Sequence, residues 1–101
     1  MSVPTSKTTE GEVVTRKFTI VNQRGLHARA SAKFVQVVDS YDARVTVEKD
    51  DISVGGTSIM GLMMLAASPG CHIRVTARGP QAKELVDALD RLISTRFGEE
   101  N

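Results

Sequence analysis

The segment that most constrains the fold is "CHIRVTAR", residues 71–78, in which apolar and polar side chains alternate without interruption. In a strand, Cys71, Ile73, Val75 and Ala77 point to one face, and the four polar side chains point to the other. Strands of parallel sheets are covered on both faces and rarely carry such a polar side. The alternation therefore predicts an antiparallel sheet with one covered face and one face open to solvent.

Other segments supply the remaining elements. Residues 16–21 and 44–49 also alternate, and "KDD" turns the second of these into "ISV", which predicts a hairpin. Apolar side chains at helical spacing predict one helix over about residues 28–40 and another that begins at Pro80. A short helix is expected after Ser58. The predicted fold is α+β, βαββαβα: an open-faced β-sandwich with a four-stranded antiparallel sheet and three helices on one face.

The predicted domain spans residues 16–97. Residues 1–15 are rich in Ser, Thr and Glu and contain few large apolar side chains, which favours a flexible N-terminal tail. Residues 98–101 are expected to form a flexible C-terminus. The first fifteen residues lack the apolar region of a signal peptide, and the longest apolar run, residues 59–67, is too short to cross a bilayer.

Charge and cysteine content narrow the range of partners. A net charge of +1 provides no strong electrostatic footprint for a nucleic acid or an anionic membrane surface. A single cysteine excludes an internal disulfide and fits a reducing compartment. We therefore expect a cytoplasmic protein with no nucleic-acid or membrane partner. We also expect a monomer.

The sequence "RGLHARASAKF" places His27 where a loop ends and a helix begins. The first N–H groups of a helix have no partner within it and mark the positive end of its dipole, so this position suits an anion such as phosphate. The same field opposes a positive charge on the imidazole and leaves a ring nitrogen free as a nucleophile. Arg29 adds a guanidinium that can hold a pair of phosphate oxygens, and Ala28 leaves the ring uncrowded.

Two other interpretations of His27 stay open on these residues alone. A single histidine at a helix start is often a cap or an ordinary surface residue. Metal binding is disfavoured, because His72 is the only other histidine and no spacing typical of a zinc site is present. Cys71 lies on the predicted inner face of its strand, where a structural thiol is expected.

A second segment, "GGTSIMGLMML", combines a serine at a helix start with an apolar run. If Leu62 and Leu65 face the core, Met60 and Met63 cannot face it with them. The short helix is then either buried all round or exposes an apolar docking patch, a use to which methionine is well suited. A P-loop is excluded, because the lysine that this pattern requires is missing.

Together, "GLHARASAKFV" and "GGTSIMGLMMLAASPG" resemble the two signature segments of HPr, the phosphocarrier family of the bacterial phosphotransferase system. The resemblance covers about residues 16–97 and implies a phosphoryl carrier, without a cofactor, rather than a stand-alone enzyme. It implies that His27 is phosphorylated on Nδ1 by phosphoenolpyruvate-dependent Enzyme I and passes the group to an enzyme IIA. Ala28 and Arg29 would bind the phosphoryl group.

The resemblance also assigns roles in the second segment. Ser58 would match the regulatory serine that HPr kinase/phosphorylase modifies in some bacteria, and Ile59, Met60 and Met63 would match the docking surface for Enzyme I and enzyme IIA. Ala30 stands where most members have proline, and "HARASAKF" is similar to the nitrogen-related, regulatory branch. The alternative function is a regulatory binding protein whose phosphorylation state partners read without onward transfer.

A phosphoryl carrier must avoid hydrolysis, so it should hold no general base beside the phosphoryl group. No acidic residue occurs among the ten residues before His27. We therefore expect no carboxylate near its ring.

Overall fold

The computed structural model describes residues 12–99. Its elements follow the predicted order, with one additional short 3-10 turn at the C-terminal end. They are β1 (Val13–Thr19), α2 (Ala28–Asp39), β2 (Arg44–Lys49), β3 (Ile52–Gly55), α3 (Ile59–Met64), β4 (His72–Arg78), α4 (Ala82–Ser94) and η1 (Arg96–Gly98).

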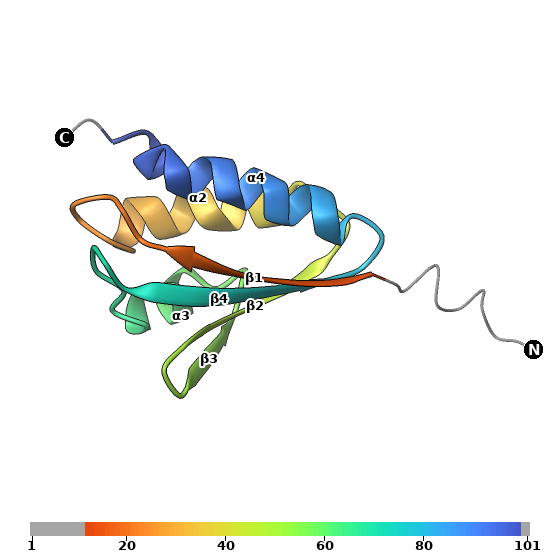
Figure 1. The fold of residues 1–101 in the computed structure, drawn as a ribbon, viewed down its shortest axis with the longest axis horizontal. Helices are drawn as coiled ribbons and strands as arrows, with labels where there is room; N and C mark the ends of the chain where they lie inside the picture. The colour runs from red at the N-terminus through yellow and green to blue at the C-terminus, as the bar shows by residue number, and fades with distance from the viewer. Residues whose placement is uncertain (1–11, 100–101) are drawn as a thin grey trace, which may run out of the picture.

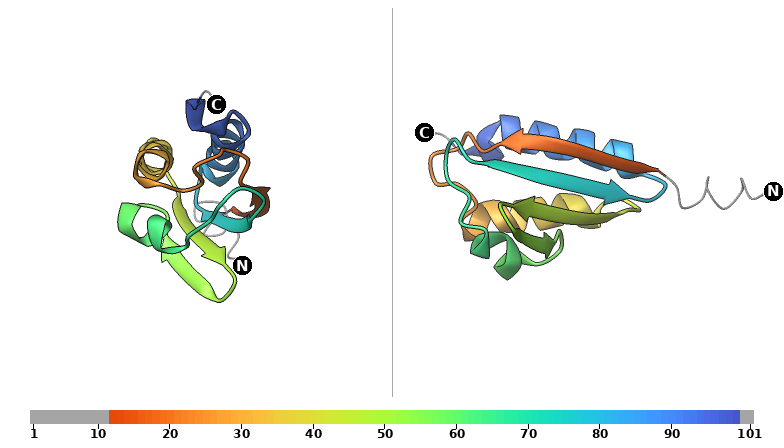
Figure 2. Two further views of the ribbon diagram at one scale, coloured as in Figure 1. Left: turned by 90° about the vertical axis from the view of Figure 1, so that its left-hand side faces the viewer. Right: turned by 60° about the horizontal axis from the view of Figure 1, so that its bottom comes forward.

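The four strands form one sheet in the order β1-β4-β2-β3, and every neighbouring pair is antiparallel. The long helices α2 and α4 lie side by side over one face of this sheet, with α3 next to α2 towards β3 (Figures 1 and 2). Among the residues that the structure describes, no helix covers the opposite face. The predicted α+β open-faced sandwich is confirmed.

The core lies between the sheet and the helices, as the alternation of residues 71–78 predicts. Ile73, Val75 and Ala77 are buried, whereas His72 and Arg74 on the other face are exposed. The helices contribute the apolar stripes expected from their spacing, with the buried side chains Ala30, Phe34 and Val38 from α2, and Ala82, Leu85, Val86, Leu89 and Ile93 from α4.

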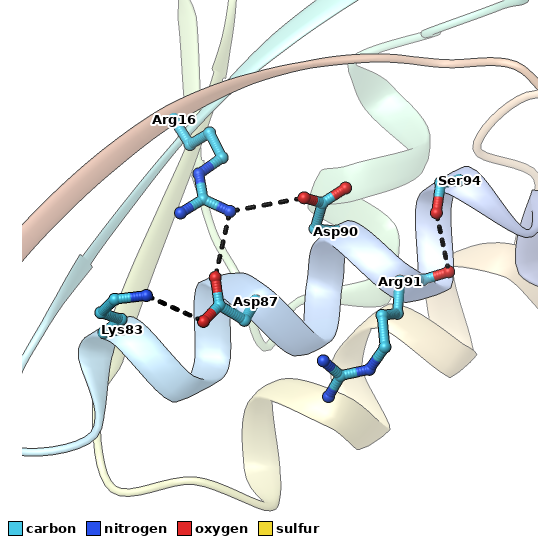
Figure 3. Close-up of polar contacts among 6 residues, drawn as sticks. All are labelled: Arg16, Lys83, Asp87, Asp90, Arg91 and Ser94. Carbon is cyan, nitrogen blue, oxygen red and sulfur yellow. Dashed lines mark hydrogen bonds and ion pairs between the residues drawn. The ribbon is translucent and has the colours of Figure 1, made fainter.

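Polar contacts fasten β1 to α4 at the margin of this core (Figure 3). Arg16 lies on the covered side of β1 and donates from Nη1 to Asp87 (3.2 Å) and Asp90 (3.5 Å). Lys83, one turn before Asp87 on α4, donates to the same carboxylate at 3.0 Å. The hydrogen bond from Lys83, and then the one from Arg16, hold the pKa of Asp87 below its usual value. Because these side chains are well exposed to solvent, they orient α4 more than they stabilise it.

Three predicted boundaries were wrong. β1 begins at Val13, inside the predicted tail, because the full length of β4 offers pairing partners and Val13 lies opposite Arg78. α4 begins at Ala82 after the N-cap Gln81, so Pro80 precedes the helix. The predicted C-terminus from residue 98 is not free, because Gly98 lies in η1 and Glu99 contacts the site described below. Residues 1–11 and 100–101 of the two predicted tails lie outside the described residues.

The structure contains, among residues 12–99, no helix that is long and apolar enough to cross a membrane.

Candidate functional site around His27

His27 is the N-cap residue of α2, as its sequence context predicts. Its backbone is extended (φ −76°, ψ −178°), and its carbonyl accepts the first helical hydrogen bond, from the Ser31 N–H at 2.8 Å. Its side chain forms no capping hydrogen bond to the helix. The imidazole is therefore available for other contacts, and the first N–H groups of α2, which include those of Ala28 and Arg29, have no partner within the helix.

The loop before His27 is pressed against the segment that follows α3. Gly25 has a φ of +65°, and a Cβ at this position would lie 2.2 Å from the carbonyl oxygen of Ala67. The Leu26 N–H donates to that same oxygen at 3.0 Å. Only glycine permits this approach at position 25. The contact brings the start of α2 close to the end of α3, although about forty residues separate them in the chain.

A carboxylate contacts the imidazole of His27, contrary to the expectation drawn from the preceding residues. Glu99 Oε2 lies 2.5 Å from Nε2, and the two residues are 72 positions apart in the chain. Both carboxylate oxygens also accept from Asn22 Nδ2 at 3.2 Å. The Asn22 amide is completely buried and donates as well to the Gly25 carbonyl at 2.9 Å. Asn22 thus joins Glu99 to the loop that carries His27.

The C-terminal segment that brings Glu99 to His27 is anchored by Phe97. Phe97 is 1% exposed within the core, and its carbonyl accepts from Lys33 Nζ of α2 at 2.7 Å. Gly98, with a φ of +77°, then turns the chain towards the start of α2. Sequence reasoning missed Asn22 and Glu99. The one signal available was Phe97, a large apolar residue after the end of the helical stripe, which indicates that the chain still contacts the core there.

The contact between Glu99 and His27 decides which ring nitrogen is free. The hydrogen bond to His27, aided by the one from Asn22, holds the pKa of Glu99 below its usual value despite partial burial. An ionised carboxylate can only accept, so Nε2 carries the hydrogen. In a neutral imidazole the second nitrogen, Nδ1, then has a free lone pair. Phosphorylation at Nδ1, which the family resemblance implies, stays a prediction.

Arg29 lies two residues after His27, in the first turn of α2. Its side chain is exposed and has no hydrogen bond or ion pair within residues 12–99. The guanidinium is thus free to meet an anion from solvent or from a partner. In the same part of the chain, no group of three or more His, Cys, Asp or Glu side chains is arranged to hold a metal ion.

The segment from Ser58 onwards forms the predicted short helix with an exposed apolar surface. Ser58 caps α3, since its Oγ accepts from the Gly61 N–H at 2.9 Å. Leu62 and Leu65 are buried, and the interpretation of the helix as buried all round was wrong. The exposed side chains form what we call the methionine patch: Ile59, Met60, Met63 and Met64. Sequence reasoning missed Met64, which is 67% exposed at the last helical position.

The fold and this surface define a small single-domain protein that presents one histidine beside an apolar patch. Residues 14–95 match the family described as "PTS HPr component phosphorylation site". The phosphocarrier protein HPr of Cupriavidus necator is 45% identical over 84 residues, which cover 83% of this chain and 94% of that protein. The HPr of Neisseria meningitidis is 49% identical over 80 residues, or 79% of this chain and 90% of that protein.

Solved structures agree with these sequence relatives. HPr-C-His from Thermoanaerobacter tengcongensis superposes with a TM-score of 0.82 at 40% identity, covering 87% of this chain and 99% of that one. The HPr of Bacillus anthracis superposes with a TM-score of 0.77 at 35% identity, covering 82% of this chain and 99% of that one. The chain belongs to the HPr family of phosphocarrier proteins of the phosphotransferase system.

Proposed function

We propose that this phosphocarrier accepts a phosphoryl group on Nδ1 of His27 from Enzyme I and passes it to an enzyme IIA. The observation that carries the proposal is the contact between Glu99 and Nε2. This contact leaves the Nδ1 lone pair free on a ring that stands at the open N-terminus of α2. A nucleophile and an anion-binding helix start are thereby combined in one residue.

The transfer step conserves charge without a proton leaving the ring. The Nδ1 lone pair forms a bond to phosphorus, and the bond between phosphorus and the donor atom of Enzyme I breaks, with its electron pair remaining on the donor. The imidazole then carries phosphorus on Nδ1 and hydrogen on Nε2, so it holds a positive charge. The carboxylate of Glu99 balances that charge, and the reverse displacement delivers the phosphoryl group to the acceptor.

Each neighbouring residue has a defined role in this proposal. The Arg29 guanidinium and the Ala28 N–H bind the phosphoryl oxygens, which the positive helix end also favours. Glu99 is a positioning residue, because it acts on the ring and not on the phosphoryl group. Since His27 and Asn22 already engage both of its oxygens, the carboxylate is held away from the task of activating water for hydrolysis.

We assign partner docking to the methionine patch and regulation to Ser58. A small apolar patch beside a charged group suits brief contacts with Enzyme I and enzyme IIA. Phosphorylation of Ser58 by a kinase of the HPr kinase/phosphorylase type would place about two negative charges next to the patch and weaken docking. The free thiol of Cys71 supports a reducing, cytoplasmic location. Membership of the nitrogen-related branch stays a prediction.

The test is phosphotransfer from phosphoenolpyruvate through purified Enzyme I, followed by phosphorus NMR. Wild type should give one acid-labile phosphohistidine signal. His27→Ala should abolish it, whereas His72→Ala, which removes the other histidine, should retain it. An unchanged signal in His27→Ala would overturn the assignment. Adding an enzyme IIA should discharge the phosphohistidine; a phosphorylated protein that no enzyme IIA discharges would favour the regulatory binding function instead.

A further inference from the structure

A hollow of about 530 Å³ opens at the end of the sheet where β4 leads into α4. Figure 1 shows this turn at the right-hand end of the sheet. It is lined by Tyr41, Asp42, Ala43, Arg44, Arg78, Gly79 and Pro80. Its volume falls in the range of small-molecule sites. Because α2 runs from His27 at one end to the turn before Tyr41 at the other, the hollow lies about 18 Å or more from the phosphotransfer site. We call it the arginine hollow.

Two cations stand next to each other in this hollow. Arg44 of β2 and Arg78 of β4 are directly opposite in the sheet register, and both are exposed. Like charges directly opposite on neighbouring strands destabilise a sheet. Neither guanidinium has an ion pair or hydrogen bond within residues 12–99. The two guanidiniums therefore repel each other in the free protein, and an anion that binds between them would reduce this repulsion.

The acidic residues nearby do not neutralise this pair. Asp42 lines the hollow, and Glu12 lies close by, since its carbonyl accepts from the Gly79 N–H at 3.0 Å. Neither carboxylate lies within 4.0 Å of a basic nitrogen among the described residues. The lining side chains therefore carry two positive charges and one negative charge.

The walls of the hollow are fixed before any ligand arrives. The Gln81 N–H donates to the Asp42 carbonyl at 3.0 Å, and Gln81 Oε1 accepts from the Asp42 N–H at 2.8 Å. Gly79 has a φ of +141°, and a Cβ there would lie 2.9 Å from Ala43 Cα, so the two loops are in direct contact. A preformed site avoids the cost of ordering loops on binding.

We propose that the arginine hollow binds a small phosphate monoester. A phosphate monoester carries close to two negative charges at neutral pH, so it can balance the charge of both guanidiniums. A carboxylate carries one negative charge and can balance only one of them. Tyr41, Ala43 and Pro80 offer apolar surface for the organic part of the ligand. This site is separate from the phosphotransfer site and does not depend on the function proposed for His27.

Phenyl phosphate is a suitable probe, with benzoate as the matched monoanion, in NMR titrations of the full chain at constant ionic strength. The proposal expects saturable shifts in the amides of residues 42–44 and 79 and in the Nε–H signals of Arg44 and Arg78. Benzoate should bind about tenfold more weakly or worse. Shifts at the start of α2 report a separate event and are followed independently.

The variants Arg78→Gln and Arg44→Gln should each weaken phenyl phosphate binding at the hollow by about tenfold or more. Arg74→Gln is the matched control, because it removes the same charge from the open face of β4 outside the hollow. It should change the affinity by less than about twofold. Shifts that never saturate, equal affinity for benzoate, or an Arg78→Gln variant that binds like Arg74→Gln would each overturn the proposal. Thermal unfolding of all three variants verifies that they fold.

Discussion

The two helices that meet beside the site, α2 and α3, begin in opposite ways. α3 is capped by its own N-cap side chain, because Ser58 Oγ accepts from Gly61 N–H. α2 has no side-chain cap, because the imidazole of His27 turns away from the helix to Glu99. The Ser58 side chain thus stabilises its own helix, whereas the His27 side chain is left available for phosphoryl transfer. The open N–H groups at the start of α2 are then available to a phosphoryl group that the start of α3 could not hold in the same way.

The two helices also differ in what stabilises them. α2 buries a full stripe of side chains, so it tolerates an uncapped N-terminus. α3 is a helix of 6 residues in which only Leu62 is buried, so its cap matters more. The cap of Ser58 should therefore matter for stability and its charge state for docking, whereas a change at His27 should affect mainly transfer.

A serine at position 27 would give α2 the kind of cap that α3 has. We expect this His27→Ser variant to fold but not to accept a phosphoryl group. His27→Ser and His27→Ala both remove the nucleophile, so neither should accept a phosphoryl group. The serine can cap the helix, and its variant should be more stable than the alanine variant by about 1 kcal/mol. Phosphotransfer assays and urea unfolding of the two variants test this. Equal stabilities would mean that the start of α2 has no need of a cap.

Two substitutions at Ser58 should separate its role as a helix cap from its role in regulating docking. Ser58→Asp keeps a capping oxygen but adds a negative charge beside the methionine patch, so phosphorylation of His27 by Enzyme I should slow by about tenfold with little loss of stability. Ser58→Ala should do the reverse, losing about 1 kcal/mol while transfer stays near the wild-type rate. Initial rates and unfolding curves of both variants decide the matter; a Ser58→Asp variant with the wild-type rate contradicts the regulatory role.

The parts that sequence predicted correctly are those with local signals. The alternation of residues 71–78 and the helical stripes specify faces, and so they predicted the sheet and the core. For Met60 and Met63 the periodicity left burial and exposure open, and only the family resemblance implied an exposed docking surface. Ser58 was recognisable as a cap because a cap acts within one turn. The contact of Glu99 with His27 has no local signal, because a buried Phe97 and a turn at Gly98 create it across the fold.

The remaining features that the sequence did not predict depend on which residues face each other in neighbouring strands. Val13 joins β1 because β4 offers it a partner in Arg78, which no property of residues 13–15 alone reveals. The opposition of Arg44 and Arg78 is equally invisible until β2 and β4 are paired. Strand pairing thus supplied the opposed arginines at one end of α2, whereas the burial of Phe97 and the turn at Gly98 supplied the missed carboxylate at the other.

The smallest effect, and the one that sharpens the comparison most, concerns Glu99. Glu99→Gln keeps the shape of the side chain but removes the charge that balances a phosphorylated imidazole, so phosphorylation of His27 should slow by roughly threefold to tenfold. Glu84→Gln, an exposed carboxylate in the first turn of α4, is the control and should leave the rate unchanged.

The same pair of variants has a defined pH dependence. The pKa of Glu99 lies below its usual value of 4.5 in the folded protein, because His27 and Asn22 bind the ionised form. Its ionisation therefore stabilises the fold above about pH 4.5, and this contribution is lost as pH falls through the lower, folded pKa. Unfolding free energies should place Glu99→Gln below wild type at pH 7, with the gap closing towards pH 3. A gap that stays constant over this range would show that the carboxylate charge contributes nothing, and the positioning role of Glu99 would then rest on shape alone.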